Sequence, residues 1–144
     1  MMQTTYERKA HYYETDQMGI IHHANYIRWF EEARLDYMDR VGFTYARAEE
    51  CGIYIPVLAV VCEYKSIVRF AETVMIHTAV TSFNGVRMTV GYRVCGKQDG
   101  VLHATGESRH CFMNKNNRPV SLKKALPELY DKITENVIKE DIIN

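Results

Sequence analysis

Apolar side chains recur every three or four residues between Asn25 and Gly42, which is the spacing of one face of an α-helix. Asn25 is expected to cap the start of this helix, and Gly42 is expected to end it. No other segment predicts a helix of comparable length, so a β-sheet has to bury the apolar face. The face is made of Tyr26, Phe30, Ala33, Tyr37 and Val41.

Most of the remaining sequence is typical of β-strands. Residues 4–13 alternate around aromatic and threonine side chains and predict a strand before the helix. After the helix we expect strands over residues 53–68, 73–83, 86–95 and 101–113. Residues 53–68 begin as an almost unbroken apolar run, which is typical of a strand covered on both faces.

Glycine-containing turns join the last three strands into an antiparallel meander. Asn84-Gly85 predicts a hairpin with a type I′ turn, in which both residues have positive φ, and Asp99-Gly100 predicts a second tight turn. Shorter helices are expected over residues 44–50 and in the tail from residue 122. The predicted fold class is therefore α+β, an antiparallel sheet of about five strands wrapped around one long central helix.

Composition and charge limit the kinds of partner. A chain of 144 residues with 47% hydrophobic content can build one sizeable core, so residues 1–144 are expected to form a single domain. Lys plus Arg and Asp plus Glu each number 18, so neither a nucleic acid nor an anionic membrane is expected as partner.

Cysteine usage and the start of the chain point to a cellular compartment. The four cysteines form no CxxC pair and no zinc-like spacing, so no metal and no cofactor is expected. The opening MMQTTYERKA lacks an apolar signal region, and the longest apolar run, residues 53–62, is too short to span a bilayer. These features predict a cytoplasmic protein with reduced cysteines.

The stretch YYETDQMGIIHHANYIRWFEEAR resembles the opening of hotdog-fold thioesterases of the 4-hydroxybenzoyl-CoA thioesterase family. The shared pattern is an aromatic-ended first strand, an acid at Asp16, Gly19 three residues later, and Tyr26 at the start of a long helix with E-x-A-R. The later stretch NNRPVSLKKALPELY resembles the family's last strand and tail, so the likeness covers nearly the whole chain. Two departures concern substrate preference: many relatives have Tyr where His22 stands, and an Asp in the turn that reads FAET here.

The resemblance implies a hotdog fold that is active as a homodimer or homotetramer, with an acyl-CoA substrate bound between subunits. It implies that Asp16 attacks the thioester or activates water, and that the backbone N–H of His23 holds the thioester oxygen. The residues expected to contact the substrate are Gly19, His22, Tyr26, Lys65 and Arg87. Lys65 and Arg87 are included because each lies near a strand end, where it could reach a CoA phosphate.

The chemistry of the residues agrees with this assignment. Hydrolysis of a thioester needs a nucleophile or base and a donor for the developing oxyanion. The start of the helix offers unpaired N–H groups and a positive dipole end, and Asp16 lies about seven residues before His23. A simpler interpretation is that Asp16 only shapes a turn and that Lys65 and Arg87 are surface charges.

Two other functions remain open on the sequence. A hotdog hydratase or dehydratase would use His22 or His23 as base together with a helix carboxylate such as Glu31. A non-catalytic acyl-CoA-binding protein would be expected to carry an added DNA-binding module, and no basic helix-turn-helix segment is present. The enzymes differ in whether an imidazole or the Asp16 carboxylate lies in the pocket.

Overall fold

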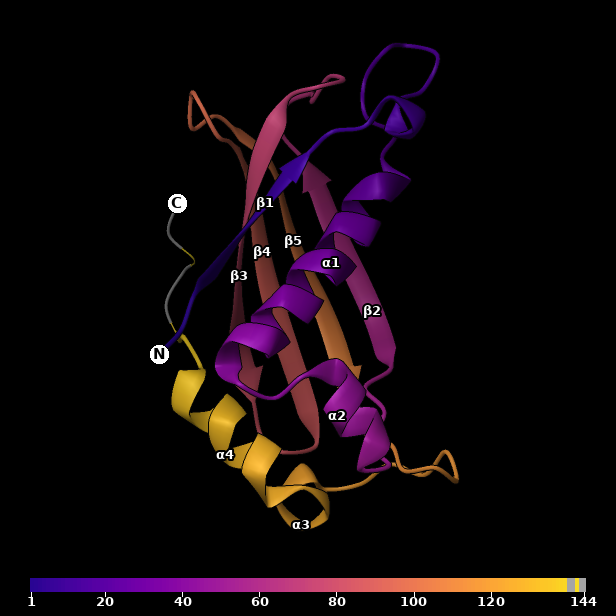
Figure 1. The fold of residues 1–144 in the computed structure, drawn as a ribbon, viewed down its shortest axis with the longest axis vertical. Helices are drawn as coiled ribbons and strands as arrows, with labels where there is room; N and C mark the ends of the chain where they lie inside the picture. Colours follow the sequence, from indigo (N-terminus) through magenta and orange to yellow (C-terminus); the bar gives the residue numbers. More distant parts are fainter. Residues whose placement is uncertain (140–141, 143–144) are drawn as a thin grey trace.

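A five-stranded antiparallel sheet in the order β1-β3-β4-β5-β2 curls around one long helix, α1 (Figure 1). The computed structural model describes residues 1–139 and residue 142. The strands are β1 (Thr4–Lys9), β2 (Val57–Tyr64), β3 (Thr73–Phe83), β4 (Arg87–Gly96) and β5 (Leu102–Cys111). The helices are α1 (Ala24–Val41), α2 (Tyr45–Glu50), α3 (Leu122–Ala125) and α4 (Pro127–Asn136), with a 3-10 turn at Tyr12–Glu14.

The core lies between α1 and the sheet, as the helical periodicity predicted. All five residues of the predicted apolar face are buried, and Trp29 and Met38 beside it are buried too. The Phe30 ring stacks on Tyr92 of β4 at a centroid distance of 4.3 Å. Gly106 of β5 makes room for this ring, since an added Cβ would come within 2.3 Å of Phe30. Gly42 ends the helix with a φ of 89°, which confirms the predicted terminator.

The segment between β1 and α1 departs from the sequence prediction. The first strand ends at Lys9 instead of residue 13, and the chain then forms the 3-10 turn. Helix α1 begins at Ala24, so Asn25 is not its N-cap, and the Asn25 side-chain amide donates instead to the Glu14 carbonyl at 2.8 Å. In Figure 1 this segment lies at the opposite end of the sheet from α3 and α4.

Two predictions for the strands are corrected. Strand β2 covers residues 57–64 instead of 53–68, and in this chain it is an edge strand with exposed apolar side chains, so it is not covered on both faces. The β3–β4 hairpin forms as expected, but only Gly85 has positive φ. Asn84 instead accepts the N–H groups of Val86 and Arg87 through its side-chain oxygen, so the turn is not type I′.

Other elements follow the pattern more closely. Strand β3 has the predicted bounds, and Thr44 caps α2 through its side chain. The tail forms two helices instead of one, because the chain breaks at Leu126 before Pro127. All four cysteines are free.

Candidate active site

A pocket of about 290 Å³ lies between the loop before α1, the first turn of α1 and the segment that follows β2. Four residues predicted from the sequence line it together: Asp16, His23, Tyr26 and Lys65. The remaining wall is mostly apolar. It consists of Met18, Ile20, Ile21, Tyr64, Ser66 and Ile67.

A tight loop holds Asp16 at the pocket. Its N–H donates to the Ile20 carbonyl at 2.9 Å, and its carbonyl accepts the Gly19 N–H at 3.0 Å. Gly19 has a φ of +75°, which explains the glycine at this position. The Asp16 Oδ1 atom accepts the Met18 N–H at 2.8 Å. Asp16 therefore has a turn role, while its Oδ2 makes no hydrogen bond to any residue that the structure describes.

Glu14 anchors the same loop, and the sequence analysis did not identify it. Its buried carboxylate accepts two bonds from Arg8, at 2.9 and 3.0 Å, one from Trp29 Nε1 at 2.8 Å and one from the His11 N–H at 2.8 Å. Burial would lower the pKa of Arg8, but hydrogen bonds to Glu32 and Glu14 outweigh this and raise it. The available signal was Trp29, because a buried indole N–H needs an acceptor.

Hydrogen bonds take up almost every backbone group around His23. The His22 N–H donates to the Glu14 carbonyl, and the His22 carbonyl accepts the Asn25 N–H. The His22 imidazole accepts the Ala24 N–H through Nδ1 at 3.1 Å and stacks on the His23 ring. Within residues 1–139 and 142, the His23 N–H makes no hydrogen bond, so it remains available as a donor at the helix start.

Tyrosine side chains form part of the pocket wall. Tyr26 is buried, and its ring meets the Tyr64 ring edge-on at a centroid distance of 5.2 Å. Burial raises the pKa of Tyr26, so its hydroxyl stays protonated and can donate a hydrogen bond. The Tyr64 hydroxyl donates to the His23 carbonyl at 2.9 Å.

Three predicted residues do not line the pocket, and Lys65, which does, has an ion-pair partner. Gly19 and His22 adjoin the pocket through the loop but do not line it. The Lys65 ammonium forms an exposed ion pair with Glu63 at 2.8 Å. Arg87 lines a separate pocket of about 310 Å³ with Arg109, so a single chain does not bring it to Asp16.

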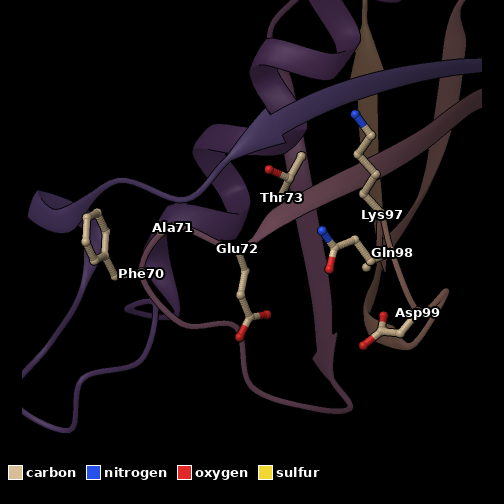
Figure 2. A pocket seen from close by; sticks show the side chains of 8 residues that line it. Phe70, Ala71, Glu72, Thr73, Lys97, Gln98 and Asp99 are labelled. Carbon is tan, nitrogen blue, oxygen red and sulfur yellow. The ribbon is translucent and has the colours of Figure 1, made fainter.

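A larger hollow of about 550 Å³ lies between residues 70–73 and 96–99 (Figure 2). Figure 2 shows Glu72, Lys97 and Asp99 around it. Lys97 is paired with Glu7 at 2.7 Å, and none of the residues predicted for the site lines this hollow. Size alone therefore does not identify the site, whereas the smaller pocket is lined by Asp16 and by His23, whose N–H makes no hydrogen bond to any described residue.

Within residues 1–139 and 142, no three His, Cys, Asp or Glu side chains are grouped to hold a metal ion. In the same part of the chain, no helix is long and apolar enough to cross a membrane.

Comparisons with known proteins match the chain to one family. Residues 11–136 match the family model described as the thioesterase-like superfamily. YneP of Bacillus subtilis is 34% identical over 85% of this chain and 88% of its own length. The acyl-CoA thioester hydrolase YbgC of Escherichia coli is 23% identical over 82% of this chain and 88% of its own. A crystal structure of a DHNA-CoA thioesterase from Staphylococcus aureus, 33% identical, superimposes with a TM-score of 0.89 over 94% of this chain and 91% of that one.

Proposed function

The chain belongs to the thioesterase-like superfamily and is a hotdog-fold thioester hydrolase, and we propose that Asp16 and the His23 N–H hydrolyse an acyl-CoA to the free acid and CoA. One observation carries the proposal. Within residues 1–139 and 142, one carboxylate oxygen of Asp16 and the backbone N–H of His23 make no hydrogen bond, and both residues line the same mostly apolar pocket.

These two groups are what thioester hydrolysis requires. The Asp16 carboxylate either attacks the carbonyl carbon, so that the C–S bond breaks and water then hydrolyses the acyl-aspartate anhydride, or removes a proton from a water that attacks the carbonyl carbon directly. In both routes CoA leaves as a thiolate and takes up the proton that the attacking water loses. The His23 N–H binds the oxygen as it gains negative charge, and one such donor contributes roughly 10²–10³ in rate. The positive end of α1 adds to the stabilisation of this charge.

The walls suit an acyl group, and the charges outside suit CoA. Ile20, Ile21 and Ile67 supply apolar surface, and the rings of Tyr26 and Tyr64 lie beside them. Lys65 at the rim would hold a CoA phosphate by giving up its exposed pair with Glu63. Arg87 would join the site only if a second copy of the chain brought it there.

We also propose a homodimer or homotetramer. The edge strand β2 exposes apolar side chains, including Val57, Leu58 and Val61, and its outer edge makes no sheet pairing with the described residues. A second copy would bury this surface and protect the edge. Light scattering that shows an active, stable monomer at micromolar concentration would contradict this proposal.

The hydratase alternative has less support. It needs an imidazole base beside a helix carboxylate. His23 lines the pocket, but Glu31 does not, and the His22 ring is occupied as acceptor for Ala24. A non-catalytic acyl-CoA-binding protein would have no use for an unengaged carboxylate oxygen in the pocket. Release of free thiol from aromatic and aliphatic acyl-CoAs separates these functions from hydrolysis.

The sharpest test replaces Asp16 by Asn and measures thiol release. Asn keeps the side-chain oxygen that accepts the Met18 N–H but loses the charge and the basicity, so kcat should fall by roughly 10² or more with little change in Tm. Asp99→Asn is a matched control, because Asp99 makes the same kind of turn bond to Val101 at 3.0 Å and lies outside the pocket. Near wild-type hydrolysis by Asp16→Asn would remove Asp16 from the mechanism.

A further inference from the structure

The turn that carries the His23 N–H is held from two directions. Within the loop and the start of the helix, hydrogen bonds made by Glu14, His22 and Asn25 hold it. A further bond comes from elsewhere in the fold. Tyr64, at the end of β2, donates its hydroxyl to the His23 carbonyl at 2.9 Å, across 41 positions of sequence.

This bond holds the His23 carbonyl from outside α1, in addition to the first intrahelical bond that an N-cap carbonyl accepts. The Tyr26 N–H also donates to that carbonyl, but at 3.4 Å, which is long for an N–H···O bond. The Tyr64 hydroxyl is a dependable donor, because burial and the neighbouring Cys62 raise the pKa of Tyr64 to about 12. The end of β2 therefore holds the start of α1 through one phenol.

Building on the function proposed above, we infer that Tyr64 is a positioning residue, which holds His23 so that its N–H meets the thioester oxygen. An oxyanion donor works only when it lies about 2.7–3.1 Å from the developing charge. The start of a helix moves more easily than its middle, because its first N–H groups lack helical partners. A tether from the sheet restricts this motion next to the donor.

The position of Tyr64 links the tether to substrate binding. Its ring forms part of the pocket wall, so an acyl group in the pocket would cover a side chain that is 48% exposed in the chain alone. Removing water from around the hydroxyl strengthens its bond to the His23 carbonyl. The His23 N–H is then held most firmly when the thioester is bound.

Tyr64→Phe tests the inference, because it removes the hydroxyl and keeps the ring against Tyr26. We expect kcat to fall roughly tenfold, less than the ~10²–10³ for loss of a donor, with KM and Tm nearly unchanged. Tyr54→Phe is the control, since Tyr54 is 41% exposed and lies outside the pocket. A wild-type kcat in Tyr64→Phe would overturn the inference.

A spectroscopic measurement separates positioning from a structural role. In an Asp16→Asn background, the infrared carbonyl stretch of a bound acyl-CoA should lie below its value in water, because the His23 N–H polarises the carbonyl. Adding Tyr64→Phe should reverse part of that shift, and adding Tyr54→Phe should not. An unchanged stretch together with a lower Tm would mean that Tyr64 only supports the fold, and the inference would be wrong.

The two proposals can fail separately. Loss of activity in Asp16→Asn with wild-type kcat in Tyr64→Phe rejects only the role of Tyr64. Hydrolysis by Asp16→Asn rejects the role of Asp16, while the comparison of Tyr64→Phe with Tyr54→Phe still reports whether the tether affects kcat.

Discussion

A line of buried hydrogen bonds beneath α1 should make the stability of the protein depend on pH through His110. Arg34 Nη1 donates to the Tyr92 hydroxyl at 3.0 Å. The Tyr92 hydroxyl lies 2.7 Å from Ser108 Oγ, which in turn lies 2.7 Å from His110 Nε2. Because arginine can only donate, the simplest arrangement has each hydroxyl donating onward to the next group. His110 Nε2 then accepts, and the imidazole is neutral.

The magnitude follows from the shift in its pKa. Burial and then the charge of Arg34 lower the pKa of His110 from 6.5 to about 4. Between pH 6.5 and pH 4, His110 is protonated in the unfolded chain but stays neutral in the folded chain. The contribution of His110 to the free energy of unfolding therefore falls as the pH drops from 6.5 to 4 and is constant above 6.5. The loss is about 2 kcal/mol at pH 5 and approaches roughly 3 kcal/mol below pH 4.

Urea unfolding at pH 7.5 and pH 5.0 checks this, with His110→Gln as the variant that cannot titrate. The wild type should lose about 2 kcal/mol more than the variant between the two conditions. Burial and Arg93 also lower the pKa of His77, which adds the same trend to both proteins and cancels in the comparison. Equal pH dependence in the two proteins, or an NMR titration of His110 with a midpoint near 6.5, would refute the reasoning.

Two further substitutions test the packing and the loop. Gly106→Ala places a Cβ 2.3 Å from the Phe30 ring, with the Val61 carbonyl 3.1 Å away, so overpacking should cost about 1–3 kcal/mol in urea unfolding. Glu14→Gln removes one of the two carboxylates that hold Arg8. Because Glu32 still pairs with Arg8, the weakened charge-assisted bonds should cost about 1.5–3 kcal/mol. We also expect Glu14→Gln to lower kcat, and wild-type thiol release would show that Asp16 does not depend on this anchor.

The elements with a clear period were predictable from the sequence, because periodicity reports directly which side chains are buried. The apolar face of α1 and the bounds of β3 are examples. The 3-10 turn was not predictable in this way, since it depends on how Glu14 meets Arg8 and Trp29 in three dimensions. The β3–β4 turn was predicted at the right place with the wrong geometry, because the Asn84 side chain can serve the backbone in more than one turn type.

The same difference between local pattern and three-dimensional contact decides which residues of the candidate site were predictable. Asp16, His23, Tyr26 and Lys65 were placed in one pocket by a loop-to-helix pattern that is local in sequence, apart from Lys65. Arg87 was proposed from its nearness to a strand end alone, and the fold puts it in another pocket. The hydrogen bond of Tyr64 to His23 could not be predicted from the sequence. The two residues are 41 positions apart, and the acceptor is a backbone carbonyl, which every residue has.

Strand β2 was predicted to be covered on both faces, and it carries Tyr64, which bonds to His23. Its apolar run predicted a strand with both faces covered, but in one chain Val57, Leu58, Val61 and Tyr64 are exposed. If the proposed second copy covers this strand, the prediction fails for the chain and holds for the assembly. Tyr64 ends that strand, and a second copy that also covered its hydroxyl would keep water from its bond to His23. Assembly would then act on kcat through the placement of the donor, even where the partner supplies no catalytic group.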